Sequence, residues 1–414
     1  MFTLKAMAKP RDEPKNITTQ DFHYELPEEQ IAHHPLAERD QAKLLIYEKG
    51  EIRHSHFRHL TEHLPEGAAL LFNDTKVVPA RLQFQKDTGA NIEIFCLEPG
   101  EEDPTLSFGM RGEVVWPCMI GNLKKWKQGQ VLHKSHQENG VTLKAQFEGK
   151  SNQQFKVRFT WNPSDYNWAE ILEYFGETPL PPYIKRETEK EDKERYQTVF
   201  SKKPGAVAAP TASLHFTQRI FKDLQKKKHP THSITLHTGM GTFKPVTESN
   251  PYNHTIHREM VIAEKETIKF LRDNSGNLIM AGTTAIRAAE SVYWLGLFLE
   301  KYQTLPEDHT LKPQFIWDCQ EEKLPPAETV LQNLIDYLES QGQEQVIFKT
   351  GLFILPGYPF PLTRGLITNF HLPQSTLLML VGTFIGDDWK KVYQEGLHQQ
   401  YRFLSYGDGS LLIP

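Results

Sequence analysis

Residues 205–216 read GAVAAPTASLHF, an apolar segment that ends in a turn of small residues carrying polar side chains. Three later segments have the same form: residues 236–243 (LHTGMGTF), residues 281–287 (AGTTAIR) and residues 366–373 (LITNFHLP). Polar groups at the ends of buried strands are typical of the active site of an α/β protein. These segments therefore predict an α/β fold that carries a site, rather than a purely structural protein.

The regions around these segments differ in their residue pattern. Strand and helix patterns alternate from residue 206 onward, which favours a largely parallel sheet. Short strand patterns separated by Gly, Asn and Asp are typical of a small barrel. Lys, Pro and acidic residues dominate the start of the chain and predict a disordered tail over residues 1–20. We expect an α/β main domain with a mostly parallel sheet, from residues 21–68 and 162–414, interrupted by an inserted small β-barrel over residues 69–161.

Three local elements can be placed within this plan. Residues 168–175 predict a helix, and Gly50 after the strand-like residues 44–47 predicts a hairpin turn. Ser375 is a suitable cap for an apolar helix over residues 376–385. The boundaries of these elements are specific enough to be compared with a structure.

Composition limits the class of protein. The chain has 414 residues, 38% of them hydrophobic, and a net charge of -5, which suits a soluble globular protein and argues against a general polyanion binder. Its three cysteines are too widely spaced for a disulfide framework or a metal knuckle, and they fit a reducing compartment. The longest apolar run is too short to cross a membrane. We expect a cytoplasmic protein with no membrane segment.

Three histidines lie at the ends of strand-like segments: His215, His237 and His371. Histidine serves as a general base at neutral pH, which makes each of them a candidate for catalysis. The three lack the close spacing of zinc ligands, and we expect no metal site. A zinc-dependent hydrolase that uses these histidines stays open as an alternative. Because the chain has 18 histidines, several of them are expected to have no role in function.

The segment after residue 281 predicts the start of a helix, with Thr283 or Thr284 as its cap. The free N–H groups and the dipole of such a helix favour a carboxylate or a phosphate. Arg287 and Glu290 lie three residues apart on one face of the same helix. The alternative is an ordinary helix cap followed by a surface ion pair.

Other polar and aromatic positions complete the candidate set. Gly239 and Gly241 allow the backbone to approach a ligand closely, although a tight turn needs the same residues and the third glycine of a dinucleotide motif is missing. Asn369 lies in a strand-to-helix turn. Tyr406, within a segment that mixes aromatic residues with arginine, is suited to stack on a nucleobase, or it belongs to a core strand.

Taken together, these segments closely resemble the S-adenosylmethionine:tRNA ribosyltransferase-isomerase family. Matching pieces run in order from about residue 21 to the end of the chain, so the resemblance does not depend on one motif. Besides the four segments quoted first, they include residues 72–82, 179–184, 196–200 and 401–408.

The resemblance implies both a fold and a reaction. The fold is an α/β main domain interrupted by a small β-barrel. The family moves the ribosyl part of S-adenosylmethionine onto the aminomethyl group of a 7-deazaguanine base at the wobble position of tRNA, and adenine and methionine leave. S-adenosylmethionine is a co-substrate, and no metal or redox cofactor is implied. The expected partners are S-adenosylmethionine and the anticodon arm of tRNA, and we expect a monomer.

The reaction assigns hypothetical roles to the matching residues. A base must remove the acidic proton next to the sulfonium, and the candidates are His215, His237, His371 and Asp408. Arg287 with Thr283 and Thr284 would hold the methionyl carboxylate. An aromatic face for the adenine or the target base would come from Phe216, Phe243 or Tyr406. The other residues expected to bind substrate are Gly239, Gly241, Thr242, Glu290 and Asn369.

The sequence departs from the family pattern at three positions. Ser213 stands where the family usually has glycine, Met240 replaces a small residue, and Gly409 lies in a Gly-Asp-Gly-Ser ending that is usually Gly-Asp-Ala-Met. Residues 300–350 also form a longer region than expected. A non-catalytic or substrate-shifted RNA-binding paralogue is therefore the alternative, and it would bind tRNA without turnover.

Two basic patches are candidates for contact with the anticodon arm, although the acidic net charge weakens a purely RNA-binding role. One patch consists of Lys124, Lys125 and Lys127, and the other of Lys202 and Lys203. The alternative for either patch is an ordinary solvated surface.

Overall fold

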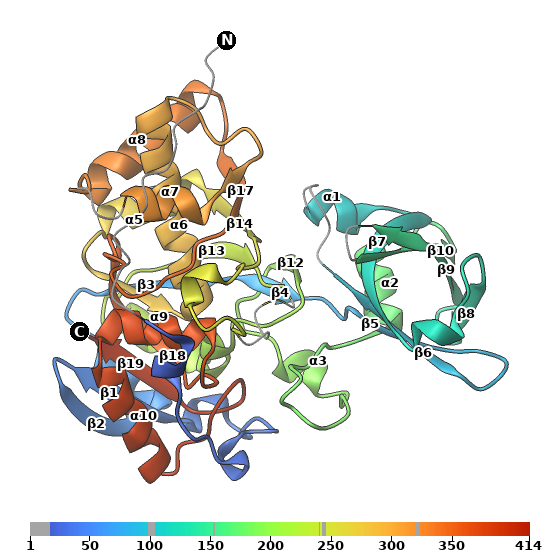
Figure 1. The fold of residues 1–414 in the computed structure, drawn as a ribbon, viewed down its shortest axis with the longest axis horizontal. Coiled ribbons are helices and arrows are strands. Elements are labelled where there is room, and N and C mark those ends of the chain that lie inside the picture. Colours follow the sequence, from blue (N-terminus) through green and yellow to red (C-terminus); the bar gives the residue numbers. More distant parts are fainter. Residues whose placement is uncertain (1–16, 98–103, 152–153, 240, 242–245, 320–322) are drawn as a thin grey trace.

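Two large sheets make up most of the fold. The computed structural model describes residues 17–97, 104–151, 154–239, 241, 246–319 and 323–414. Within them lie a ten-stranded sheet, a seven-stranded sheet and a two-stranded sheet. Figure 1 shows the seven-stranded sheet beside the ten-stranded one, forming a separate unit on the right of the view.

The ten-stranded sheet has the order β16-β17-β14-β13-β3-β15-β18-β19-β1-β2. Its strands are β1 (Lys43–Glu48), β2 (Glu51–His56), β3 (Ala69–Asn73), β13 (Thr231–His237), β14 (Glu259–Glu264), β15 (Leu278–Ala281), β16 (Thr310–Leu311), β17 (Gln345–Thr350), β18 (Thr363–Asn369) and β19 (Gly409–Ile413). The neighbours β13, β3, β15 and β18 run parallel. Both sides of this centre include antiparallel pairs: β14 with β13 and β17, β19 with β18, and β1 with β2. Parallel pairs recur near both edges, β1 with β19 and β16 with β17. The sheet is therefore mixed, with its continuous parallel run at the centre.

Helices cover both faces of the ten-stranded sheet. They are α4 (Gln218–Lys226), α5 (Lys265–Asp273), α6 (Thr283–Tyr302), α7 (Pro313–Cys319), α8 (Ala327–Ser340), α9 (Thr376–Ile385) and α10 (Asp388–His398). Alternation along β15 separates the two cores: Leu278 and Met280 pack in the cluster that contains α6, while Ile279 packs in the cluster that contains α4. The residues of β3 are buried on both faces, which explains its continuous apolar sequence.

The seven-stranded sheet is antiparallel throughout and curls on itself, in the order β11-β5-β6-β7-β10-β9-β8. Its strands are β5 (Arg81–Gln85), β6 (Asn91–Cys96), β7 (Glu113–Gly121), β8 (Val131–His136), β9 (Val141–Ser151), β10 (Gln154–Asn162) and β11 (Gly176–Glu177). The helix α2 (Trp168–Phe175) buries Trp168, Ile171, Leu172 and Phe175 against the inner face. The short helix α1 (Pro104–Gly109) lies between β6 and β7. This curled sheet has its own hydrophobic core.

The boundaries of the two units differ from the predicted ones. β3 lies in the ten-stranded sheet although it falls inside the predicted insertion, residues 69–161. α2 and β11 follow that segment in sequence and pack with the curled sheet. The strands β4 (Thr75–Val77) and β12 (Lys203–Ala206) form a parallel pair between the units. The short helix α3 (Asp192–Arg195) precedes β12 in the sequence and lies in the charged segment.

Several local predictions are confirmed. α2 and α9 have the predicted bounds, Ser375 caps α9 by accepting a hydrogen bond from the N–H of Leu378 (3.2 Å), and β1 and β2 form the hairpin that turns at Gly50. Of the predicted tail, residues 1–16 lie outside the described residues, whereas Thr19 donates a backbone hydrogen bond to Ser249. In the described part of the chain, no helix has the length and apolar character that a membrane span requires.

Candidate active site

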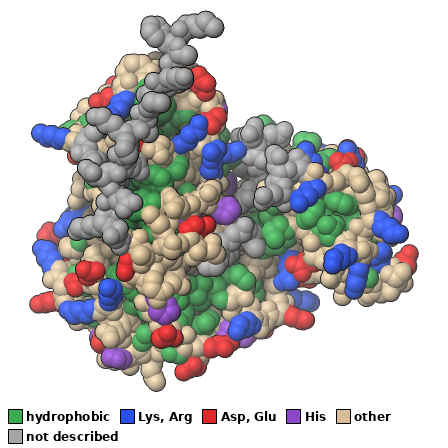
Figure 2. All heavy atoms as spheres, in the orientation of Figure 1, with side chains coloured by type: hydrophobic (Ala, Val, Ile, Leu, Met, Phe, Trp, Pro, Cys, Tyr) green, Lys and Arg blue, Asp and Glu red, His purple; other side chains and the backbone are tan. Residues whose placement is uncertain are grey.

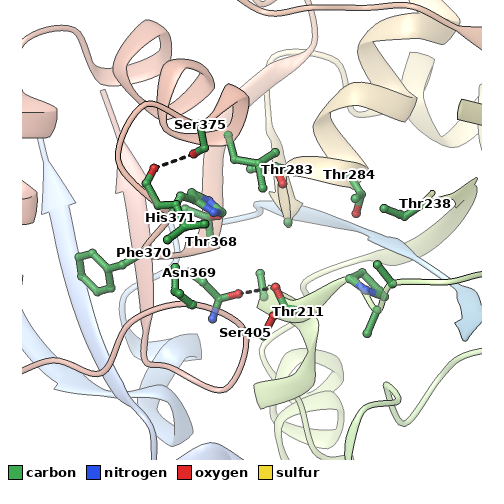
Figure 3. Close-up of a pocket in the computed structure, with 18 of the residues that line it drawn as sticks. Thr211, Thr238, Thr283, Thr284, Thr368, Asn369, Phe370, His371, Ser375 and Ser405 are labelled. Atoms are coloured by element: carbon green, nitrogen blue, oxygen red, sulfur yellow. Dashed lines mark hydrogen bonds between the residues drawn. The ribbon is translucent and has the colours of Figure 1, made fainter. Parts of the chain in front are cut away.

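A cavity of about 300 Å³ lies at the carboxyl ends of β13, β15 and β18. Figure 3 shows its lining. The described residues that line it are Tyr183, Ala208, Ala209, Pro210, Thr211, Ala212, Thr238, Gly282, Thr283, Thr284, Thr368, Asn369, Phe370, His371, Leu372, Pro373, Ser375, Leu377, Leu404 and Ser405. Each of the four segments that opened the sequence analysis contributes to this lining. Among these residues there is no Lys, Arg, Asp or Glu, so the described lining is uncharged; its surface is mainly apolar, with a few hydroxyl, amide and imidazole groups.

The start of α6 forms one wall of the cavity. β15 ends at Ala281, and Gly282 follows with a φ of 108°, a backbone conformation that favours glycine. Gly282 is therefore the N-cap, and the predicted capping by a threonine side chain is wrong, because Thr283 and Thr284 are already helical. The N–H groups of these two threonines precede the first helical hydrogen bonds at the positive end of a 20-residue helix. This wall is suited to an anionic group.

Two hydroxyl groups beside this wall have no hydrogen-bond partner among the described residues. They are Oγ1 of Thr284 and Oγ1 of Thr238, and both side chains are more than nine-tenths buried. Figure 3 shows the two threonines at the same end of the cavity, one on α6 and one after β13. A buried hydroxyl without a partner costs about 1–3 kcal/mol of stability. Such groups in a cavity indicate a ligand that completes their hydrogen bonds.

His371 faces the cavity on the loop between β18 and α9. Its Nε2 lies 2.8 Å from Oγ1 of Thr368, which orients the ring. Its backbone N–H donates to the hydroxyl of Tyr393 (3.0 Å), and its carbonyl accepts from the hydroxyl of Tyr24. Burial lowers the pKa of His371 to about 3, so the imidazole is neutral at physiological pH. When Nε2 carries the proton and donates to Thr368, Nδ1 holds the free lone pair.

The other two histidines lie outside the lining. Nε2 of His215 lies 3.2 Å from Nδ2 of Asn369, and burial lowers the pKa of His215 to about 4. Nδ1 of His237 lies 2.8 Å from Oγ1 of Thr75. Its ring packs on Gly205, where a Cβ atom would lie 2.7 Å from the ring. In the described residues, no three His, Cys, Asp or Glu side chains gather in a group that could hold a metal ion.

Arg287 points away from the cavity into a buried ion pair. Its guanidinium contacts Glu259 at the start of β14, and its Nε donates to the carbonyl of Leu352 (3.2 Å). Oε1 of Glu259 also accepts the N–H of Gly239 (3.3 Å), the residue after Thr238. The ion pair thus joins the first turns of α6 to the end of β13.

Glu290 is also buried, so the alternative of a surface ion pair with Arg287 is wrong. It accepts hydrogen bonds from the N–H (3.0 Å) and the hydroxyl (2.6 Å) of Thr363, and from the hydroxyl of Tyr358 (3.1 Å). Burial raises the pKa of Glu290 to about 7. Its contacts are structural, and it does not line the cavity.

Three more predicted residues have protein partners outside the lining. Asp408 accepts the backbone N–H groups of Lys43 (2.9 Å) and Arg402 (2.8 Å), and burial raises its pKa. Phe216 packs its ring against other phenylalanines in the core. The hydroxyl of Tyr406 donates to Asp192 (2.9 Å). The roles predicted for these residues stay predictions, but none of their side chains lines the cavity.

The departures from the family pattern can be placed in part. The hydroxyl of Ser213 donates to the carbonyl of Ala281 (3.1 Å) under the turn into α6, and Ser213 does not line the cavity. Gly409 packs against Phe57, whose ring would lie 3.1 Å from an added Cβ atom. Met240 lies outside the described residues, as do Thr242 and Phe243.

Several residues of the site were not predicted from the sequence. Tyr183 lies in a proline-rich loop and hydrogen bonds through its hydroxyl to Oγ of Ser405 (2.6 Å). Thr211 donates to Oδ1 of Asn369 (3.0 Å). The proline-rich loop was part of the family resemblance, but nothing in its sequence singled out Tyr183. Glu259 gave no signal, because a single acidic residue before an apolar strand is common.

Comparisons with known proteins agree with one another. A family model described as queuosine biosynthesis protein matches residues 19–412. The S-adenosylmethionine:tRNA ribosyltransferase-isomerase of Polynucleobacter asymbioticus is 36% identical over 401 residues, which cover 95% of this chain and 97% of that protein. The protein of the same name from Thermotoga maritima is 36% identical over 403 residues, covering 96% and 100%. A crystal structure of the S-adenosylmethionine tRNA ribosyltransferase from Thermotoga maritima is 28% identical and covers 95% of this chain and 100% of that one, with a TM-score of 0.43.

Proposed function

The chain belongs to the family of queuosine biosynthesis proteins, and on this premise we propose that it is an S-adenosylmethionine:tRNA ribosyltransferase-isomerase. It transfers the ribosyl part of S-adenosylmethionine to the aminomethyl group of a 7-deazaguanine base in tRNA, and adenine and methionine leave. The main structural support for this proposal is the cavity with an uncharged described lining, in which the neutral His371 faces the start of the long helix α6.

The start of α6 is the proposed binding site for the methionyl carboxylate. The N–H groups of Thr283 and Thr284 and the helix dipole favour an anion there. The free hydroxyls of Thr284 and Thr238 add two donors. Arg287 acts indirectly in this proposal, because its guanidinium is engaged by Glu259, and Glu259 in turn holds the N–H of Gly239.

His371 is the proposed general base. Of the four candidates from the sequence, it is the one that lines the cavity. Its low pKa keeps the ring unprotonated, and Thr368 orients it. Removal of the proton next to the sulfonium forms an imidazolium and cancels the net charge of the bound co-substrate. The net positive charge therefore passes from the co-substrate to His371, and no new charge is created. An uncharged lining destabilises this charge before and after the step to a similar extent.

Tyr183 is the proposed aromatic face for the adenine or the target base. It lines the cavity, whereas Phe216 and Tyr406, the described aromatic candidates from the sequence, do not. The other aromatic side chain of the lining, Phe370, packs against Phe403 with ring centroids 4.7 Å apart. Figure 3 shows its ring directed away from the threonines and His371.

The remaining parts of the proposal concern partners and setting. We propose that the target base is presented on the anticodon arm, that the protein works as a cytoplasmic monomer, and that the reaction needs no metal or redox cofactor. We also propose that the chain divides into the main unit and the inserted curled sheet as functional domains.

Adenine release tests the proposed function. Purified protein is mixed with S-adenosylmethionine and tRNA that carries the 7-aminomethyl-7-deazaguanine base, with the same tRNA carrying guanine as a control. We expect adenine and methionine to form with the first tRNA alone. Binding of that tRNA without release of adenine would instead support the non-catalytic paralogue.

A further inference from the structure

The turn between β7 and β8 presents three exposed lysines from the sequence Leu-Lys-Lys-Trp-Lys at residues 123–127. Lys124, Lys125 and Lys127 have no ion-pair partner among the residues that the structure describes. Trp126 between them is buried, and its Nε1 donates to the carbonyl of Gln130 (2.9 Å). The tryptophan anchors the turn, and the lysines beside it extend into solvent.

The backbone of this turn is fixed before any partner binds. Nζ of Lys86 donates to the carbonyl of Lys125 (2.7 Å) and to Oε1 of Gln130 (3.1 Å). Asn122 adopts a φ of 56°, and its carbonyl accepts the N–H of Lys125 (2.8 Å). A preorganised turn loses little conformational entropy when it binds a partner.

The hairpin of β9 and β10 lies against this turn and adds two lysines. Its contacts with the turn include the N–H of Gly129, which donates to the carbonyl of Phe147 (3.2 Å). The ring centroids of Trp126 and Phe147 lie 5.9 Å apart. We call the five exposed residues Lys124, Lys125, Lys127, Lys150 and Lys156 the lysine surface.

Lys150 and Lys156 also lack an ion-pair partner within the described ranges. The half-buried Phe155 is the cross-strand neighbour of Lys150. The acidic residue of this hairpin, Glu148, is engaged by Nε of Arg158 (2.5 Å) and so does not neutralise the lysines. Aromatic side chains among unpaired cations are typical of surfaces that bind single-stranded nucleic acid.

Basic residues are concentrated in one part of the curled sheet. Residues 104–162 contain nine Lys and Arg and three Glu, whereas residues 81–177, which span the whole curled sheet, contain 11 basic and 13 acidic residues. Figure 2 shows Lys and Arg side chains over the unit that holds the curled sheet. In the main unit, Lys203 pairs with Glu264 (2.6 Å) and Lys265 with Glu344 (3.0 Å). The lysine surface, by contrast, has no ion-pair partner among the described residues and is available to a polyanion.

From this arrangement we propose that the lysine surface binds the phosphate backbone of the tRNA substrate. This inference rests on the proposed function, which makes tRNA the substrate. The curled sheet captures the RNA by charge, and the uncharged cavity receives the nucleotide that reacts. Phosphate contacts fix the position of the RNA without reading its sequence.

The test replaces Lys124, Lys125 and Lys127 together with Gln and measures binding of tRNA over a range of salt concentrations. Each lost phosphate contact lowers the slope of log K against log salt by about 1, so we expect the slope to fall by about 3 and the Kd at low salt to rise roughly tenfold or more. A double variant, Lys150→Gln with Lys156→Gln, should lower the slope by about 2. Thermal melting checks that both variants fold.

The matched control replaces Lys222, Lys226 and Lys228 with Gln. These lysines are exposed on and after α4, they change the net charge equally, and they belong to the main unit. We expect the control to keep the wild-type slope and Kd.

The proposal would be overturned if the variant of Lys124, Lys125 and Lys127 kept the wild-type slope of log K against log salt. It would also be overturned if the control variant of Lys222, Lys226 and Lys228 lost tRNA binding while the first variant kept it. Because binding is measured without turnover, wild-type protein that binds tRNA but releases no adenine would contradict the proposed function and leave this test intact.

Discussion

The cavity and the lysine surface differ in whether their ionisable groups are charged and paired. Around the cavity, ionisable groups are either neutral, as His371 is, or paired, as Arg287 is with Glu259. On the curled sheet, five lysines stay exposed and unpaired among the described residues. A buried charge needs a partner because it has lost its hydration, whereas an exposed charge stays solvated. In the two proposals above, chemistry and capture of the RNA are therefore assigned to different units of the molecule.

The largest effect is expected when the base is removed from the cavity. His371→Asn should lower kcat by about 10²- to 10⁴-fold, the usual contribution of a general base. The KM for tRNA should not change, because the lysine surface is intact. His215→Asn, a change of a buried histidine outside the lining, is the control and should have a smaller effect on kcat. Wild-type kcat in the His371 variant would remove this residue from the mechanism.

The next effect concerns the buried ion pair that joins α6 to the end of β13. Arg287→Met leaves Glu259 buried without its partner, and breaking such a pair costs about 3–5 kcal/mol of stability. The double variant Arg287→Met with Glu259→Gln should recover part of this loss, because the uncompensated charge is gone. Chemical denaturation measures both. Wild-type stability in the single variant would show that the pair does not hold the two elements together.

A smaller and more specific effect is expected at Thr284. Its hydroxyl has no partner in the described structure, so Thr284→Val should raise the stability by about 1–3 kcal/mol, the cost of an unpaired buried hydroxyl. The KM for S-adenosylmethionine should rise roughly tenfold to a hundredfold, since one hydrogen bond to a charged ligand is lost. Thr363→Val is the matched control, because that hydroxyl donates to Glu290 (2.6 Å) and its loss should lower stability without changing this KM. The reverse pattern would place the ligand elsewhere.

A further effect, which appears only at acidic pH, is a dependence of stability on pH. Burial lowers the pKa of His371 from 6.5 to about 3 and that of His215 to about 4. Between these values the unfolded chain binds more protons than the folded chain, so stability is fully present above pH 6.5 and is lost as the pH falls. Each histidine should contribute a slope of about 1.4 kcal/mol per pH unit in this window. Denaturation of wild type and His371→Asn at several pH values should show a shallower slope in the variant.

The sequence predicted the convergence of its four polar segments because parallel strands place their carboxyl ends at one edge of a sheet. It did not predict the partner of Arg287. Glu259 is 28 positions earlier in the chain, so no local pattern links the two residues. Because α6 is buried along most of its length, its sequence has no polar face against which a buried Arg287 could be told from an exposed one. The antiparallel pairs of the sheet were not predicted, because buried parallel and antiparallel strands have similar apolar sequences.

The choice between the two basic patches also needed the structure. Lys203 forms an ion pair with Glu264, a residue 61 positions away, whereas the lysines around Trp126 are left unpaired within the described ranges. Charge pairing of this kind depends on tertiary contacts and cannot be read from a local run of lysines.

The most direct test of this division of roles is the rate of adenine release as a function of tRNA concentration. It is measured with saturating S-adenosylmethionine for His371→Asn and for the triple variant of Lys124, Lys125 and Lys127. The account predicts a lower kcat with the wild-type KM for tRNA in the first variant, and a raised KM for tRNA with near wild-type kcat in the second. A lysine variant with an unchanged KM, or a His371 variant with wild-type kcat, would contradict it.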